Sequence, residues 1–349
     1  MTLRPRRSTV ALWSAGAAAL ALAASAGAAW AWGATGHRLI GIVAMQALPA
    51  ELPAFLHTPE TIASIGELAR EPDRSKGAGQ PHDADFDTSH FVDLTEDGHV
   101  FSDNGPLIGN MPRSRHDYDV LLAKAGIDPF KAGHLYYSML EGYQQLAKDF
   151  AYWRIETAIL KKNLVPEHRA WIETDLKRRE QLIIRDLGYW AHFVGDASQP
   201  MHVSIHYNGW GDYPNPDGFT LEKVHGPFEG DYVFQHVNER SVKAALPAPA
   251  DCGPNPQACV VGYLLRTKDQ VTPFYRLEKG GAFSSDAGTA FANERVAAGA
   301  AMLRDLVTRA WRDSDRQGIG YRPLITSLQV ESGAASDRQA LWDDLYGND

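Results

Sequence analysis

The sequence has only two cysteines among its 349 residues and few of the patterns that mark β-strands. Two cysteines exclude a fold held together by many disulfides, and they are a weak signal for a zinc site. Alternating runs of β-branched residues between tight turns are scarce, so we expect a mainly helical, all-α fold. We find no internal repeat and no linker long enough for a second domain, which predicts one helical domain over residues 32–349.

Basic residues and long apolar segments are also few. The chain has 34 Lys and Arg against 43 Asp and Glu, a net charge of −9. This excludes binding of polyanions through a general basic surface, so a phosphate substrate requires local positive charge, which bound divalent ions can supply. After the N-terminal segment no apolar run has the length of a membrane span. We therefore expect a monomer without stable membrane insertion.

The first 31 residues have the composition of an export signal. Three arginines precede an Ala/Leu-rich segment over residues 10–24, and a small-x-small cleavage motif ends at Ala31. This pattern predicts cleavage near Ala31 and an exported protein, either periplasmic or secreted. In such a compartment Cys252 and Cys259 are expected to form a disulfide across a short loop.

Apolar residues recur at helical spacing along most of the remaining chain. We expect helices over residues 53–68, 117–125, 129–162, 166–198, 268–280 and 286–311, and a short one near 337–345. Residues 96–115 are rich in Gly, Pro, Asn and Asp, which predicts a long loop.

Residues 190–208, WAHFVGDASQPMHVSIHYN, contain three potential metal ligands. His192 and Asp196 are four positions apart, so they lie on one face of a helix. Pro200 prevents the helix from continuing, so His202 comes from a bend and can approach a second ion. Burying charged groups among the apolar residues of this stretch is costly unless they have partners. The alternative is a helix end with a satisfied core histidine.

Two further pairs of candidate ligands lie on either side of this stretch. Cleavage at Ala31 gives Trp32 a free amine, which can chelate a metal together with the Trp32 carbonyl, and His37 can join it. His225 and Glu229 form a second pair four residues apart, which suits a helix that begins near Pro227. The alternative for Trp32 is a buried aromatic residue at the start of a helix.

Asp73 and His90 complete the candidate set. Asp73 lies in a polar segment that is otherwise an exposed turn, and His90 lies in an apolar segment where a core histidine is the alternative. Nitrogen and oxygen ligands without a thiolate suit zinc at a catalytic site, and their number fits three ions. The candidates are Trp32, His37, Asp73, His90, His192, Asp196, His202, His225 and Glu229.

The order and spacing of these residues resemble the trinuclear-zinc single-strand nucleases of the S-one/P-one type and their relatives, the zinc phospholipases C. The shared patterns span Trp32 to Glu229: W-G-x-x-G-H, D-x-x-K, H-F-V-D, H-F-x-G-D-x-x-Q-P-x-H and H-x3-E. The H-x3-D-x5-H part is the most specific. The resemblance implies one helical domain with long loops.

The resemblance also implies a ligand set for each of three zinc ions. The first would be held by Asp73, His90, His192 and Asp196, the second by Trp32, His37 and the bridging Asp196, and the third by His202, His225 and Glu229. The implied reaction is hydrolysis of single-stranded DNA, RNA or a 3′-nucleotide to 5′-phosphates. In this reaction a hydroxide shared by two ions attacks phosphorus in line.

The same resemblance assigns roles to residues around the ions. Lys76 would act with the metal-binding Asp73 and Asp196 in catalysis, because a basic residue at this position stabilises transition-state charge. Phe91 and Asp93 match residues that stack on a nucleobase and hydrogen-bond to it. The alternative for this pair is a core aromatic residue and a capping acid.

Two features differ from the usual nuclease pattern. The last ligand pair is H-x3-E, as in the phospholipases C, whereas the nucleases usually have H-x3-D. The loop after His202 contains NGWGD, whereas many nucleases have a Gly-Gly-Asn turn there. The short W-x4-H opening and the D-x-x-K motif favour the nucleases. We therefore predict an exported zinc-dependent nuclease and 3′-nucleotidase. The alternatives are a zinc-dependent phospholipase C and a non-catalytic exported zinc-binding protein.

Overall fold

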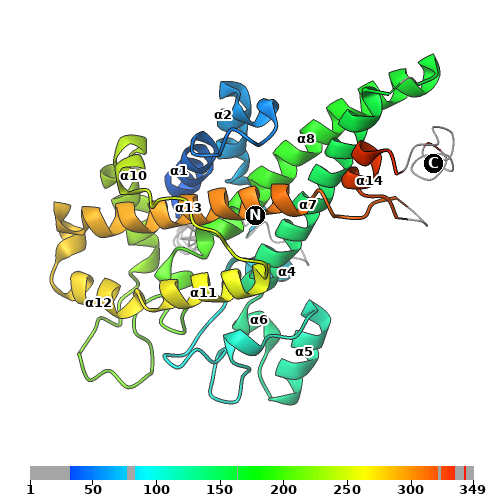
Figure 1. Ribbon diagram of the computed structural model, residues 1–349. Helices are drawn as coiled ribbons and strands as arrows, with labels where there is room; N and C mark the ends of the chain where they lie inside the picture. The colour runs from blue at the N-terminus through cyan, green and yellow to red at the C-terminus, as the bar shows by residue number, and fades with distance from the viewer. Residues whose placement is uncertain (1–31, 77–82, 163, 321–323, 335–341, 343–349) are drawn as a thin grey trace, which may run out of the picture.

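The computed structural model describes residues 32–76, 83–162, 164–320, 324–334 and 342 (Figure 1). The predicted signal segment and nearly all of the helix predicted near residues 337–345 lie outside these ranges.

The described part of the chain is helical, which confirms the predicted all-α class. It forms no β-strand, and its extended segments make only isolated bridges such as the one between Leu94 and Val100. None of the described helices combines the length and the apolar character that a membrane crossing requires.

Four long helices form the centre of the molecule: α1 (Gly33–Gln46), α7 (Leu135–Leu160), α8 (Pro166–Asp196) and α13 (Thr289–Asp313). Helices α7 and α8 form an antiparallel pair that packs against α13, and α1 packs against both α13 and α8 (Figure 1). The contact between α7 and α13 includes the rings of Phe150 and Trp311, whose centroids are 5.4 Å apart in an edge-to-face arrangement.

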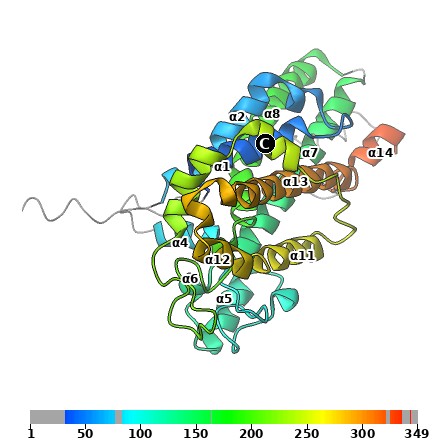
Figure 2. The same ribbon diagram turned by 90° about the vertical axis from the view of Figure 1, so that its left-hand side faces the viewer.

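Shorter helices surround this centre. They are α2 (Pro59–Leu68), α3 (Glu71–Arg74), α4 (Asp83–Asp87), α5 (Arg115–Lys124), α6 (Pro129–Ala132), α9 (Val233–His236), α10 (Glu239–Ala245), α11 (Pro256–Lys268), α12 (Val271–Lys279) and α14 (Ser327–Ser332). Single turns occur at η1 (Ala54–His57), η2 (Thr88–His90), η3 (Ile108–Asn110), η4 (Pro200–His202), η6 (Ala282–Ser284) and η7 (Asp286–Gly288), with a π-helix at η5 (Pro227–Tyr232). Helices α5 and α6 lie at the opposite end of the molecule from α2 (Figures 1 and 2).

Two predicted helices are each divided in the structure. The one predicted over residues 129–162 breaks at Gly133, whose φ of 84° is left-handed, so α6 and α7 are separate. A Cβ at Gly133 would lie 2.1 Å from the carbonyl oxygen of Phe91, so only glycine permits this close approach. The helix predicted over residues 53–68 breaks at Thr58, whose side chain caps α2 by accepting a hydrogen bond from the Thr61 amide.

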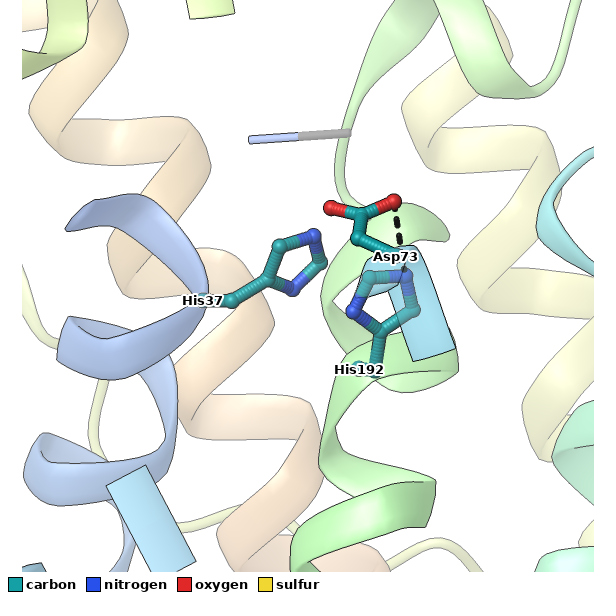
Figure 3. Close-up of side chains that lie close together, drawn as sticks. All are labelled: His37, Asp73 and His192. Carbon is teal, nitrogen blue, oxygen red and sulfur yellow. Dashed lines mark ion pairs between the residues drawn. The ribbon is translucent and has the colours of Figure 1, made fainter. Parts of the chain in front are cut away.

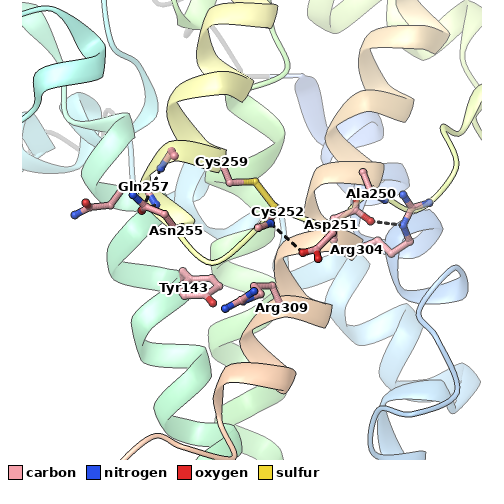
Figure 4. Close-up of a disulfide and its surroundings, with 12 residues drawn as sticks. Tyr143, Ala250, Asp251, Cys252, Asn255, Gln257, Cys259, Arg304 and Arg309 are labelled. Carbon is pink, nitrogen blue, oxygen red and sulfur yellow. Dashed lines mark hydrogen bonds and ion pairs between the residues drawn. A yellow bond between two sulfur atoms is a disulfide. The ribbon is translucent and has the colours of Figure 1, made fainter.

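The region of the two cysteines contains a helix that we did not predict. Helix α11 begins directly after Asn255, whose side chain accepts hydrogen bonds from the amides of Gln257 and Ala258. Cys252 and Cys259 form the predicted disulfide, which joins the preceding loop to the first turn of α11 (Figure 4). The helix predicted over residues 268–280 is α12, which begins at Val271.

Candidate metal centre

Side chains from distant parts of the sequence meet at the end of α8. The structure brings together eight of the nine predicted ligands, and all eight side chains are buried: His37, Asp73, His90, His192, Asp196, His202, His225 and Glu229. Figure 3 shows His37 of α1, Asp73 of α3 and His192 of α8 facing one another.

Three groups within this cluster have the spacing of metal ligands. In each group, one nitrogen or oxygen atom per residue lies within 4.8 Å of the others: His37 with Asp73 and His192, His90 with His192 and Asp196, and His202 with His225 and Glu229. The resemblance instead places Asp73 with His90, His192 and Asp196. In the structure Asp73 groups with His37, because the first turns of α1 and the short helix α3 both pack against α8.

The last turns of α8 present His192 and Asp196 on one face. The Nε2 atom of His192 lies 3.3 Å from Asp196 Oδ2. The other ring nitrogen, Nδ1, is 2.8 Å from the carbonyl oxygen of Ala69, an arrangement in which Nδ1–H donates and Nε2 remains available to a metal. Helix α8 ends at Asp196, and Pro200 begins the tight turn that carries His202. The chain therefore bends between Asp196 and His202, the second and third candidate ligands of this stretch, as predicted.

Asp196 lies between several histidines. Its Oδ1 atom is 3.4 Å from His37 Nε2, and its Oδ2 atom is 3.1 Å from His90 Nδ1. His202 Nδ1 is 3.8 Å from Oδ1, so Asp196 also links this side of the cluster to the third group. Because its two oxygens face different histidines, this carboxylate can bridge two ions.

The third group is held by Glu229 on the π-helix η5. Glu229 Oε1 is 2.8 Å from His225 Nε2 and 3.3 Å from His202 Nε2. The Nδ1 atom of His202 is 2.6 Å from the carbonyl oxygen of His90, which again directs Nε2 towards the cluster. π-Helical turns are rare and frequently occur at functional sites.

Gln199 is a supporting residue to which the sequence analysis gave no role. Its Nε2 atom donates to Glu229 Oε1 at 2.7 Å, and its side chain is fully buried. Hydrogen bonds of this kind orient the residues that hold a metal. The available signal was its place between Asp196 and Pro200 in the motif, but its contact with Glu229 depends on the tertiary fold.

The cluster fits metal ions because many of its buried polar atoms have no hydrogen-bond partner among the described residues, although several lie close to an oppositely charged group of the cluster. Leaving such an atom unsatisfied costs about 1–3 kcal/mol. These atoms are His37 Nδ1 and Nε2, Asp73 Oδ1, His90 Nε2, Asp196 Oδ1, His202 Nε2, His225 Nε2 and Glu229 Oε2. Two ligands of a tetrahedral zinc are roughly 3.4 Å apart when each is about 2.1 Å from the metal. The 3.3 Å separation in both the His192–Asp196 and the His202–Glu229 pairs matches this value.

The pKa values of His202 and Glu229 depend strongly on the charged groups beside them. Burial lowers the pKa of His202, but the nearby carboxylates of Asp196 and Glu229 have a larger effect in the opposite direction. Together these effects raise the pKa of His202 to about 9. Burial raises the pKa of Glu229, but His225 and His202 have a larger effect in the opposite direction. The pKa of Glu229 is therefore lowered to about 2. Without metal ions, protons on histidines supply the positive charge that these carboxylates require. Bound cations can supply that charge instead.

Lys76, Phe91 and Asp93 lie around this cluster. Lys76 Nζ is 3.6 Å from Asp73 Oδ1, and Phe91 is half-buried directly after His90. Asp93 is buried, its Oδ1 atom has no partner in the described residues, and burial raises the pKa of its carboxyl group well above the usual range despite the opposing effect of His202.

The indole ring of Trp32 fixes the position of this residue beside the end of α8. The ring is fully buried and donates from Nε1 to the carbonyl oxygen of Gly195 at 2.8 Å and to the Ser198 hydroxyl at 3.0 Å. A Cβ on Gly33 would lie 3.0 Å from the carbonyl oxygen of Glu229, so the start of α1 packs against the third group. Chelation by the Trp32 amine stays a prediction.

Comparison of the chain with models of known protein families, with curated proteins and with solved structures gave no match. The interpretation of the centre therefore depends on the residues themselves. They form buried groups of histidine and carboxylate ligands that could hold metal ions.

Proposed function

We propose that this protein is an exported zinc-dependent phosphodiesterase that hydrolyses single-stranded nucleic acid and 3′-nucleotides to give 5′-phosphates. The observation that carries the proposal is the buried cluster of histidine and carboxylate groups, many of whose atoms have no hydrogen-bond partner among the described residues. Nitrogen and oxygen donors without thiolates are common ligands of catalytic zinc. We assign three zinc ions to this cluster, one for each group and with Asp196 as a bridge.

The residues around the cluster suit a phosphate ester. Zinc ions bound there would lower the pKa of water and offset the negative charge of the phosphate. Lys76 adds a positive charge at the edge of the cluster, and its side chain is 20% exposed, so it can reach a substrate. This local charge explains how so acidic a chain could bind a polyanion.

We assign the recognition of a nucleobase to Phe91 and Asp93. The half-buried ring of Phe91 offers a flat apolar face, and Asp93 offers an unpartnered polar atom. Burial raises the pKa of Asp93 and so favours its protonated carboxyl group, the form that donates a hydrogen bond to a ring nitrogen or carbonyl of a base. Phospholipase C activity is the second candidate. Glu229 favours it, because this ligand position carries glutamate in the phospholipases that the sequence resembles.

The test is hydrolysis by the purified protein lacking residues 1–31, first loaded with zinc and then stripped with a chelator. The substrates are single-stranded DNA, RNA, a 3′-nucleotide and phosphatidylcholine, and metal content is measured on the same samples. We expect zinc-dependent release of 5′-nucleotides with about three zinc ions per chain. Cleavage of the lipid alone would transfer the protein to the phospholipases, and turnover of none of the substrates would leave a zinc-binding protein without this activity.

A further inference from the structure

A cavity of about 430 Å³ lies between α7 and α8, beside the metal centre. This volume suits a small organic ligand of nucleotide size. Its walls mix aromatic rings with charged and amide side chains, chiefly Phe86, Tyr189, Phe193, Arg115, Arg185 and Gln145. The ligands assigned to the metal ions are not among its lining residues, so the cavity is a separate feature of the molecule.

The cavity shares a wall with the metal centre. The ring of Phe193 lies edge-on to the rings of His90 and His192, with centroids 5.3 Å and 5.5 Å away. Ser89 lines the cavity, and His90, the next residue, faces Asp196. A ligand in this cavity therefore lies one side chain away from the residues that would bind the metal.

Three residues of α8 form a stripe that leads from solvent towards that wall. Arg185, Tyr189 and Phe193 are spaced four positions apart, so they lie on one face of the helix. The guanidinium carbon of Arg185 is 4.8 Å from the centre of the Tyr189 ring, and the Tyr189 and Phe193 ring centroids are 6.1 Å apart. Tyr189 also interacts with the side chain of Ser75, next to Lys76. The stripe therefore connects the cavity to the edge of the centre where the proposed substrate phosphate binds.

The charges in the cavity do not favour phosphate. Arg115 pairs with Glu141 at 2.9 Å, and Arg185 pairs with Asp186 at 2.7 Å, so both cations already have carboxylate partners. What remains is flat aromatic surface with carboxylate, amide and guanidinium groups at its rim. A planar heterocycle with donors and acceptors on its edge matches this combination, because bases stack on aromatic rings and on guanidinium planes.

We propose that this cavity binds the base of a neighbouring nucleotide when the metal centre cleaves a strand, with Tyr189 and Arg185 as the stacking surface. The inference rests on the proposed function and extends it. The cavity would give the enzyme a preference for strands over mononucleotides, because a 3′-nucleotide has no second base to place there.

The experiment compares a short single-stranded oligonucleotide with a 3′-nucleotide as substrates of the zinc-loaded protein. The variants are Arg185→Ala and Tyr189→Leu. The matched control is Arg178→Ala, since Arg178 lies on the same helix, has a side chain that is 62% exposed like that of Arg185, and also pairs with an aspartate. Binding of a cleavage-resistant phosphorothioate oligonucleotide is measured in parallel, together with the zinc content.

We expect the ratio of the oligonucleotide KM to the 3′-nucleotide KM to rise roughly fivefold in Arg185→Ala and roughly tenfold in Tyr189→Leu. The Kd for the phosphorothioate strand should rise by the same factors, and Arg178→Ala should leave the ratio and the Kd unchanged. Equal changes for both substrates, or no change for the oligonucleotide, would overturn the inference. If the wild type cleaves no nucleic acid, the proposed function fails separately, and the phosphorothioate Kd values still decide whether the cavity binds a strand.

Discussion

Helix α8 takes part in two groups of buried charged residues that differ in how their charges are balanced. Near the middle of the molecule, both oxygens of Asp149 on α7 accept hydrogen bonds from Gln145, and Oδ1 also accepts one from Arg179 of α8 at 2.9 Å. At the end of α8, the cluster of candidate ligands has several buried atoms without a hydrogen-bond partner among the described residues. In the first group both carboxylate oxygens have hydrogen-bond partners within the chain, and Arg179 Nε is the buried atom left without one, whereas the second group leaves several ligand atoms that a metal ion could bind.

The pKa values of Asp149 and Asp196 differ in a way that helps to separate a buried charge with a structural role from one at a functional site. Burial raises the pKa of Asp149 even though Gln145 and Arg179 oppose the rise, so this position costs stability that the ion pair only partly recovers. For Asp196, the opposing effect of His192 and His202 exceeds that of burial and lowers its pKa well below the usual range. A buried carboxylate is therefore a better indicator of a metal site when its neighbours are several buried histidines than when they are an arginine and an amide.

Metal removal should give the largest contrast between the two groups. Each ion bound at a concentration 1,000 times its Kd adds about 4 kcal/mol to the free energy of unfolding, so stripping the centre should lower the Tm by more than about 10 °C. Hydrogen exchange should rise at the end of α8 near Asp196 and stay slow around Asp149. An unchanged Tm after complete removal of metal, verified by metal analysis, would contradict this expectation.

Substituting one aspartate from each group should separate stability from activity. Asp149→Asn leaves the Arg179 guanidinium without its buried carboxylate partner and should lower the free energy of unfolding by about 3 kcal/mol. Zinc content and hydrolysis should stay at wild-type levels, because the centre is intact. Asp196→Asn should instead reduce the zinc content and lower the rate of hydrolysis more than about 100-fold. This loss is larger than the loss of about 10–100-fold expected for a residue that only orients a metal ligand. Chemical denaturation, metal analysis and one activity assay test both variants. Equal loss of zinc in the two would show that the groups are not independent.

The sequence predicts the buried cluster of candidate ligands better than the surroundings of that cluster. The spacing of His192 and Asp196 and the stop at Pro200 are local properties, so the helix predicted over residues 166–198 agrees closely with α8. The grouping of Asp73 with His37 depends on where α3 and α1 pack against α8, and no local pattern contains that information.

The same reasoning explains the incorrect helix boundaries. Gly133 divides a predicted helix because its backbone approaches the carbonyl group of Phe91, which is a tertiary contact. Helix α11 was not predicted because the Gly and Pro residues around Cys252 suggested a loop, whereas Pro256 occupies the first turn of the helix. The cavity beside Tyr189 requires α7 and α8 to be placed together, so periodicity alone could not predict it.

The pH dependence of stability should give the smallest contrast. Rising pH should lower the stability of the metal-free protein but strengthen the binding of zinc. In the metal-free protein the pKa of His202 is raised from 6.5 to about 9. The charged form of His202 therefore contributes stability that is fully present below pH 6.5 and is lost as the pH rises through 9. For Glu229 the pKa falls from 4.5 to about 2, so its contribution is present above pH 4.5 and is lost as the pH falls through 2.

These shifts predict that the metal-free protein loses on the order of 2 kcal/mol of stability between pH 6.5 and 9. Zinc binding has the opposite dependence, because the ligands must lose their protons before they can hold the ion. The difference in Tm between zinc-loaded and metal-free protein should therefore widen as the pH rises over this range. Asp149→Asn should show the same widening as the wild type, since its substitution lies outside the centre. Parallel curves with and without zinc would mean that His202 holds no metal, and the centre would then have to be reassigned to the groups around Asp196 alone.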